Sequence, residues 1–175
     1  DGSTSSQTLP VPPTQGESMK PAFNTLKSNF TSARVMRQPQ LFAEIGWDDL
    51  AGKAAFENTC AIRLSLALVK SGLTIPGRMR IKAGKYKGKL IEPGQAKLAA
   101  ILARPAFFGR PEKFKMSEAE EGIGSRQGVV SFFDVNPMVQ TRQGHIDIVY
   151  PAAGVRICGT TCFWLAKELW FWPLD

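Results

Sequence analysis

Three cysteines and one histidine are the residues of this chain with the clearest capacity for nucleophilic chemistry. Cys158 and Cys162 are close enough in sequence to form a local pair, which leaves Cys60 as a single free thiol. A free cysteine combined with a histidine elsewhere in the chain is a candidate nucleophile with its base. If thiol chemistry operates here, its members are Cys60 and His145. The alternative is that Cys60 is a small buried hydrophobic residue, as most free cysteines are.

Cys60 falls in the first turn of the strongest predicted helix, which covers residues 59–71. Asn58 can cap this helix, and Gly72 can end it in a left-handed conformation. The interior is apolar nearly all round, so we expect a central and buried helix. Unpaired N–H groups and the positive end of the helix dipole lie in the first turn, where they favour a thiolate and can stabilise an oxyanion.

His145 opens a predicted strand and could stand beside the thiol as base and later as acid. The alternative is a partly exposed strand histidine without a catalytic role. Asp147 shares the strand face of His145 and could support the imidazolium, although side chains two residues apart on a strand diverge. The next strand is the other source of an orienting group, and that region offers Arg156, Thr160 and Thr161 but no Asp, Asn or second His. The residues alone leave the third member of the site open.

Cys158 and Cys162 flank the short segment Gly-Thr-Thr. Four-residue spacing around a glycine-containing turn can bring the two Cα atoms within the ~4.4–6.8 Å that a disulfide requires. Zinc is the rival interpretation, but a zinc site needs four ligands and a closer cysteine spacing, and we expect no metal. A disulfide indicates that the protein works in an oxidising compartment, although the N-terminus carries no secretory signal peptide. This combination favours export by a machine that needs no cleavable signal.

Helical periodicity dominates the first half of the chain, and short apolar or alternating segments dominate the second. Helices followed by antiparallel strands indicate an α+β fold, with the helices packed on one face of a sheet. Besides the helix that carries Cys60, we expect three more helices. The first begins at Pro21, with Phe23, Leu26 and Phe30 on one face; the second covers residues 40–45 and is closed by Gly46; the third covers residues 94–103. The expected strands cover residues 128–134, 145–150, and at least one of 162–165 and 169–172.

The length of 175 residues suits one domain. Residues 1–20 are mostly polar and rich in Ser, Thr and Pro, so we expect a flexible tail or a remnant of an expression vector, with Met19 as a possible natural start. Residues 21–175 would then form the single folded domain. No apolar run approaches the ~20 residues of a transmembrane helix, and we expect no membrane partner.

The formal net charge of +7 favours an anionic partner. The densest basic stretch, residues 78–89, alternates with other residue types and contains glycines, which is typical of an exposed hairpin. We interpret it as a solvated face and expect no nucleic-acid partner, because no nucleic-acid-binding motif accompanies the charge.

Three segments resemble one known family. Residues 58–65, with the sequence NTCAIRLS, resemble the nucleophile segment of the fourth family of type VI secretion amidase effectors, which are peptidoglycan hydrolases of the NlpC-like papain superfamily. Residues 144–147 (GHID) resemble the histidine segment of that family, and residues 170–174 (WFWPL) resemble its C-terminal strand. The resemblance spans about residues 21–175 and implies a papain-like NlpC-type fold, in which the nucleophile helix packs on an antiparallel sheet.

The resemblance also implies roles for individual residues. Cys60 would be the nucleophile and His145 the base, with no metal or organic cofactor. The third residue of the family is an Asp associated with the loop between the two late cysteines, but this chain has Gly-Thr-Thr there. Asp147, in the shared histidine segment, is the substitute that we assign. The late cysteine pair matches a disulfide found in some members of the family.

The implied function is that of a secreted antibacterial cysteine amidase, delivered by the secretion apparatus into the periplasm of a target Gram-negative cell. The family cuts the peptidoglycan stem peptide between the γ-carboxyl of D-glutamate and meso-diaminopimelate, and a cognate immunity protein protects the producer. Two alternatives stay open. One is a Cys–His hydrolase or acyltransferase that acts on a different amide; the other is a non-catalytic basic module that binds an anionic polymer, with Cys60 merely packed.

Overall fold

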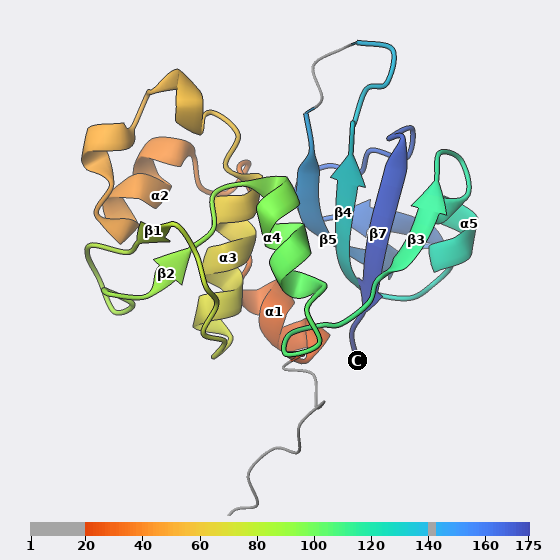
Figure 1. Cartoon of the computed structure of the whole chain (residues 1–175), viewed down its shortest axis with the longest axis horizontal. Coiled ribbons are helices and arrows are strands. Elements are labelled where there is room, and N and C mark those ends of the chain that lie inside the picture. The colour runs from red at the N-terminus through yellow and green to blue at the C-terminus, as the bar shows by residue number, and fades with distance from the viewer. Residues whose placement is uncertain (1–19, 140–142) are drawn as a thin grey trace, which may run out of the picture.

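The chain divides into a helical half, formed by its N-terminal part, and a sheet half, formed by its C-terminal part (Figure 1). The computed structural model describes residues 20–139 and 143–175. The predicted tail over residues 1–20 lies outside the described residues except for Lys20. Helices precede antiparallel strands, so the predicted α+β class is confirmed.

One helix forms the centre of the helical half. This helix, α3, spans Cys60–Lys70, and every residue from Cys60 to Val69 is buried. The burial follows from its sequence, which is apolar nearly all round. The other helices are α1 (Phe23–Asn29), α2 (Gln38–Ile45), the 3-10 turns η1 (Asp48–Leu50) and η2 (Ala54–Phe56), α4 (Gln95–Leu102) and α5 (Ala119–Ile123).

The predicted helix boundaries agree with the structure at α2, α3 and α4 within one or two residues. Gly46 ends α2 with φ 78°, and Gly72 follows α3 with φ 97°, both in the left-handed region that glycine favours. The helix expected from Pro21 begins at Phe23 instead. The N–H of Phe23 is hydrogen-bonded to the carbonyl oxygen of Asp175, which joins the two ends of the domain at the point where the helix starts.

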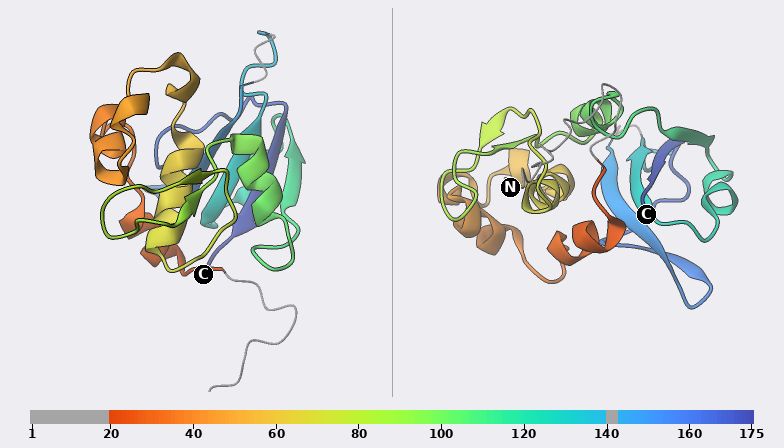
Figure 2. Two further views of the ribbon diagram at one scale, coloured as in Figure 1. Left: turned by 60° about the vertical axis from the view of Figure 1, so that its left-hand side comes forward. Right: turned by 90° about the horizontal axis from the view of Figure 1, so that it is seen from below.

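Five strands form one antiparallel sheet in the order β3-β7-β4-β5-β6. Their bounds are β3 Glu112–Lys115, β4 Gly128–Phe133, β5 His145–Ala152, β6 Val155–Cys158 and β7 Glu168–Pro173. A separate two-stranded hairpin pairs β1 (Met79–Arg80) with β2 (Leu90–Ile91), as the basic stretch predicted. α3 packs against β5, while α5 lies on the opposite side of the sheet (Figure 2).

The sequence predicted at least one strand from residues 162–165 and 169–172, and β7 confirms this prediction, while residues 162–165 form no strand. One prediction about the sheet needs correction. β5 does not stop before Pro151 but continues to Ala152. The pairing of β5 with β4 ends at Val149, so Pro151 has no partner on that side and its missing N–H breaks no hydrogen bond between the strands. On the other side of β5, Pro151 pairs with Arg156 and continues the hairpin into β6.

The sheet is covered on both faces, whereas the sequence predicted helices on one face only. The larger core lies between the sheet and helices α1 to α4 and includes Trp47, Ile62 and Trp172. A smaller core on the other face combines Ile123 of α5 and Ala166 of the segment before β7 with β4, β5 and β7. The sheet strands are therefore rigid supports for whatever side chains stand at their ends.

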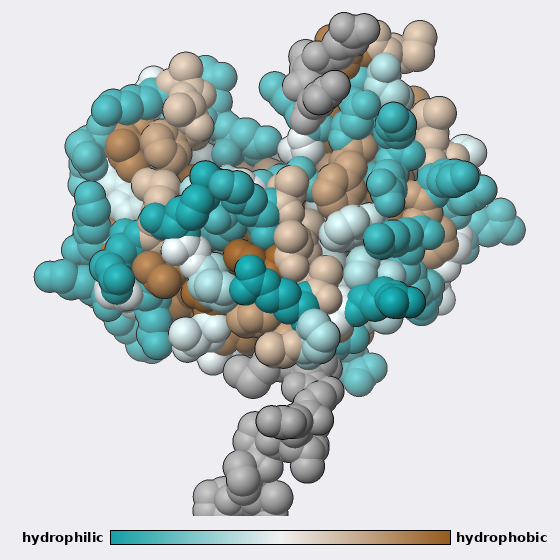
Figure 3. Space-filling view, in the orientation of Figure 1, coloured by the Kyte–Doolittle hydropathy of each residue, from teal (hydrophilic) through white to brown (hydrophobic). Residues whose placement is uncertain are grey.

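The positive charge of the chain is concentrated in one segment. Residues 76–111 contain nine Lys and Arg and a single acidic residue, Glu92, a net charge of +8 against +7 for the whole chain. All nine basic side chains are exposed, and Glu92 is buried, where it accepts hydrogen bonds from Arg78 at 2.8 and 2.9 Å. Figure 3 shows strongly hydrophilic side chains across this face of the helical half, over β1, β2 and α4. The remainder of the chain is almost neutral.

Candidate active site

The free thiol stands at the positive end of the buried helix. Cys60 is the first residue of α3 and is 8% exposed. Thr59 takes the N-cap position, while the side-chain oxygen of Asn58 accepts a hydrogen bond from the N–H of Cys60 at 3.2 Å. Asn58 therefore accepts the hydrogen bond at the helix start, as the sequence predicted. The helix itself begins at Cys60, one residue later than predicted. The dipole and the first-turn N–H groups of α3 face the sulfur.

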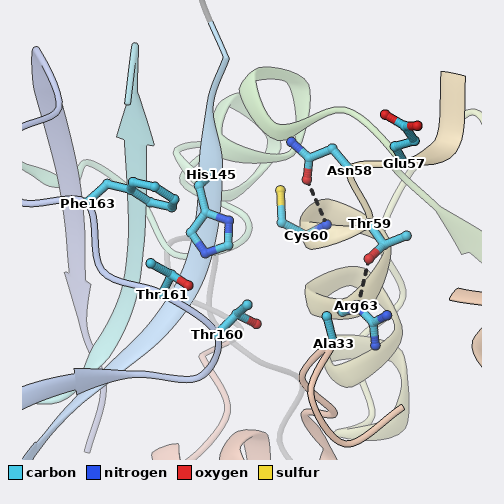
Figure 4. Close-up of a pocket in the computed structure, with 10 residues that line it drawn as sticks. All are labelled: Ala33, Glu57, Asn58, Thr59, Cys60, Arg63, His145, Thr160, Thr161 and Phe163. Carbon is cyan, nitrogen blue, oxygen red and sulfur yellow. Dashed lines mark hydrogen bonds between the residues drawn. The ribbon is translucent and has the colours of Figure 1, made fainter. Parts of the chain in front are cut away.

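The sole histidine stands opposite this thiol, at the first residue of β5. Figure 4 shows the His145 ring and the sulfur of Cys60 facing each other across one cavity. The ring is 9% exposed and is held by two aromatic neighbours: Phe132 stacks on it at a centroid distance of 6.0 Å, and Phe163 meets it edge-on at 5.2 Å. The imidazole is thus fixed by packing in the orientation that turns one ring edge toward Cys60.

Asp147 contacts the other edge of the imidazole. Its Oδ2 lies 2.7 Å from Nε2 of His145, and the carboxylate is fully buried. Side chains two residues apart on a strand are expected to diverge, yet the His145 ring reaches along the strand to this carboxylate. Of the groups weighed as the third member, the structure therefore brings Asp147 to the histidine. Arg156 instead donates its Nε–H to the carbonyl oxygen of Gly124, away from the cavity.

Backbone N–H groups complete the surroundings of the Asp147 carboxylate. Oδ2 accepts from the N–H of Thr160 at 2.9 Å and of Thr161 at 3.2 Å, and Oδ1 accepts from the N–H of Ile148 at 2.8 Å. A buried carboxylate with this many donors is held in one orientation. Thr160 and Thr161 therefore act on the site through their backbones, by fixing the residue that fixes His145.

The protonation of His145 follows from these contacts. Burial by itself lowers the pKa of the imidazole, but hydrogen bonds and charge attraction from Asp147 and then from Cys60 outweigh it and raise the pKa to about 9. The ring is consequently an imidazolium at neutral pH, with Asp147 on one side and the sulfur on the other. This is the charge arrangement that an imidazolium–thiolate pair requires.

The predicted disulfide is present between Cys158 and Cys162, with a Cα–Cα distance of 5.3 Å. The bridge closes the short loop that supplies the two threonine N–H groups to Asp147. Gly159 in this loop is tightly enclosed, since an added Cβ would lie 2.4 Å from the Phe30 ring and 2.7 Å from Asp147 Oδ1. The disulfide loop is therefore part of the support of the candidate site.

The cavity between α3 and β5 has a volume of about 190 Å³. Its wall combines residues from the start of α3, the start of β5 and the disulfide loop: Ala33, Glu57, Asn58, Thr59, Cys60, Arg63, His145, Thr160, Thr161 and Phe163 (Figure 4). Asn58 also links the elements that carry Cys60 and His145, because its side-chain nitrogen donates to the carbonyl oxygen of Gly144, the residue before His145, at 3.2 Å.

Sequence reasoning missed five wall residues, Ala33, Glu57, Thr59, Arg63 and Phe163. Phe163 carries no signal that separates it from an ordinary core aromatic. Arg63 does carry one: it is the only charged residue in the otherwise apolar interior of the helix, and it follows Cys60 by three residues, which places both on one helical face.

Across residues 20–139 and 143–175, no three His, Cys, Asp or Glu side chains gather as a possible metal site. Within the same ranges, no helix has the length and apolar character needed to cross a membrane. 

Comparison with known proteins identifies the family. The family described as "Type VI secretion system (T6SS), amidase effector protein 4" matches residues 56–172, about two thirds of the chain, including both Cys60 and His145. The chain belongs to this family. It is an antibacterial peptidoglycan amidase, a type VI effector delivered into the periplasm of the target bacterium.

Solved structures of effectors from the same family share the fold of this amidase effector. The effector in the Tae4-Tai4 effector-immunity complex from Enterobacter cloacae is 19% identical, with a TM-score of 0.68 over 90% of this chain and 100% of that one. The type VI effector Tae4 from Enterobacter cloacae is 20% identical, with a TM-score of 0.67 over 90% and 99%. Tae4 from Salmonella typhimurium, in complex with the Enterobacter cloacae immunity Tai4, is 17% identical, with a TM-score of 0.66 over 89% and 100%. Curated protein sequences give no significant match.

Proposed function

We propose that residues 21–175 form a single cysteine amidase domain in which Cys60 is the nucleophile, His145 the acid and base, and Asp147 the residue that orients the imidazole. The observation that carries the proposal is the placement of the sole histidine between the free thiol at the start of α3 and the buried carboxylate of Asp147. A binding module with a merely packed Cys60 would have no need of this charge arrangement, because a buried imidazolium and carboxylate are costly unless paired.

The bond that we propose for cleavage is the amide between the γ-carboxyl of D-glutamate and meso-diaminopimelate in the peptidoglycan stem. The Cys60 thiolate adds to the γ-carbonyl carbon, and the carbonyl oxygen takes up the negative charge. N–H groups in the first turn of α3 stabilise this oxyanion. The intermediate collapses with cleavage of the C–N bond, while His145 transfers its proton to the departing amine.

Hydrolysis of the thioester completes the cycle. The imidazole of His145, now neutral, takes a proton from a water molecule whose oxygen attacks the thioester carbonyl. The C–S bond breaks, the glutamate γ-carboxyl group leaves and loses its proton to the solvent, and the imidazolium–thiolate pair is restored. Asp147 keeps the same ring edge of His145 through both half-reactions, so that the other edge always faces the reacting atoms.

We also infer that this effector has a cognate immunity protein. Relatives with the same fold have been solved as effector-immunity complexes of Tae4 with Tai4. An immunity protein that covers the cavity beside Cys60 would block the peptidoglycan stem from reaching the thiol. Co-expression with the neighbouring gene product and measurement of cell survival tests this inference directly.

Purified diaminopimelate-type sacculi provide the decisive assay for the cleavage. Wild type should release fragments whose masses correspond to stems cut after glutamate, and Cys60→Ala should lower the rate by about 10⁴-fold or more, because the covalent route is lost. Cys60→Ala changes one buried atom group, so circular dichroism and thermal unfolding should show a folded variant. Unchanged cleavage by this variant would eliminate the proposed nucleophile.

The same assay separates the remaining alternatives. Cleavage that depends on Cys60 but gives other fragment masses would keep the thiol mechanism and reject the proposed bond, as expected of a Cys–His hydrolase or acyltransferase on another amide. Strongly salt-dependent binding to sacculi without fragment release, and without any effect of thiol alkylation, would favour the basic binding module.

A further inference from the structure

Arg63 is a buried cation in the wall of the catalytic cavity. It is 3% exposed and lies on α3 one turn after Cys60. Its Nε–H donates to the hydroxyl of Thr59 at 2.8 Å, and one Nη1–H donates to the carbonyl oxygen of Thr31 at 3.1 Å. Both acceptors are neutral, and within the described residues no Asp or Glu lies within 4.0 Å of the guanidinium.

This arrangement is the reverse of what charge burial favours. Two exposed arginines each donate a forked pair of hydrogen bonds to one carboxylate: Arg78 to Glu92, and Arg126 to Glu112. The buried Arg63 has none. A buried charge without a counter-ion destabilises the fold, and burial lowers the pKa of Arg63, yet a guanidinium keeps its proton in proteins. The site is therefore electrostatically incomplete until an anion enters the cavity.

The position of Arg63 relative to Cys60 limits which anionic group of a substrate can pair with the guanidinium. Residues three apart on an α-helix are separated by about 4.5 Å along the axis and share a face. In a γ-linked D-glutamyl residue, four carbon–carbon bonds separate the γ-carbonyl carbon from the free α-carboxylate carbon, a span of at most about 5 Å. A carbonyl carbon at the Cys60 sulfur thus brings the α-carboxylate of the same residue to the level of Arg63.

We propose that Arg63 binds the free α-carboxylate of the D-glutamyl residue whose γ-carbonyl is attacked by Cys60. The inference rests on the proposed function and adds the group that selects the substrate. The two neutral contacts hold the guanidinium plane, which leaves Nη2 for a charge-assisted bond to the ligand. In an α-linked peptide, a residue other than glutamate offers no carboxylate at this distance, so Arg63 would distinguish glutamyl bonds from the amides of other residues.

Two synthetic stem peptides test the proposal: L-Ala-γ-D-Glu-meso-diaminopimelate and the same peptide with the glutamyl α-carboxylate converted to a carboxamide. Wild type should cleave the carboxylate peptide with a kcat/KM about 10- to 100-fold higher, the usual range for a hydrogen bond to a charged group. Arg63→Gln should lower kcat/KM on the carboxylate peptide by the same factor and leave the carboxamide peptide almost unaffected. Arg104→Gln, an exposed arginine outside the cavity, should keep the wild-type preference.

Each other result has a defined meaning. Equal cleavage of the two peptides by wild type overturns the inference without any variant, even if Arg63→Gln fails to fold. An equal loss on both peptides in folded Arg63→Gln overturns it as well, since a merely structural arginine acts on both. Arg63→Lys keeps the charge without the fork and should recover part of the preference. If wild type cleaves neither peptide and leaves sacculi intact, the proposed function fails first.

Discussion

The titration of His145 is the sharpest test of the site, because the chain contains a single histidine and its imidazole signal needs no assignment. The structure raises the pKa of this ring from 6.5 to about 9. A shift of this size corresponds to about 3 kcal/mol of preference for the charged form in the folded state. Since the ring is buried between Asp147 and Cys60, solvent screens little of this energy.

The sign of the effect on stability follows from linkage. A folded-state pKa above the unfolded value means that His145 stabilises the fold fully below pH 6.5 and loses this contribution as the pH rises through about 9. The unfolding free energy should therefore fall by about 3 kcal/mol between pH 6 and pH 10 from this residue alone. Urea unfolding of wild type and His145→Gln at both pH values isolates the term, because the variant lacks it.

The measurement itself is an NMR titration of protein labelled with carbon-13 at the histidine ring, after removal of any affinity tag. We expect a midpoint near 9 in wild type and lower midpoints in Cys60→Ala and in Asp147→Asn, because each variant removes one of the two groups that raise it. A wild-type midpoint near 6.5 would refute the imidazolium–thiolate arrangement. A midpoint that Cys60→Ala leaves unchanged would show that the sulfur and the ring do not interact.

Two further predictions concern the support of Asp147. Replacement of Cys158 and Cys162 by serine should lower the unfolding free energy by about 2 kcal/mol, the entropy of a five-residue loop. The same change should affect kcat more than KM on sacculi, and wild type treated with dithiothreitol should lose kcat in parallel. A kcat equal to that of untreated wild type in both samples would contradict the role given to the loop. Gly159→Ala should destabilise the fold by about 1–3 kcal/mol and lower the His145 midpoint, because its Cβ would collide with Phe30 and Asp147. Gly154→Ala, at a turn with open space but with φ 80°, adds backbone strain without a collision and should leave the His145 midpoint unchanged. A His145 midpoint that Gly159→Ala also leaves unchanged would refute the steric argument.

The central parts of the site were predictable from the sequence because they rest on local rules. The apolar run after Asn58 predicts a buried helix, and Gly72 predicts its end, so the placement of Cys60 at the helix start follows from periodicity and capping alone. The strand that begins at His145 follows from alternation in the same way. Both predictions were confirmed for the elements, while the catalytic roles stay a proposal.

The features that the sequence did not predict depend on contacts between residues that are far apart in the chain. β3 and β6 are short edge strands whose partners, β7 and β5, lie far away or across a tight turn, and their own residues carry a weak signal. The contact of His145 with Asp147 depends on the ring being turned by Phe132 and Phe163, which come from other segments. Among the residues that the structure describes, Arg63 has no carboxylate within 4.0 Å, which is likewise a property of the packed core and cannot be predicted from sequence spacing.

The uneven distribution of positive charge gives this protein a lasting electrical polarity. Residues 76–111 hold essentially all of the excess charge, and none of them lines the cavity beside Cys60. Near a polyanionic network such as the cell wall, electrostatic attraction therefore orients residues 76–111 toward the network before any stem peptide reaches the thiol. Ionic strength should then change how long the molecule dwells on the network, while the rate of bond breaking on a small soluble peptide hardly responds.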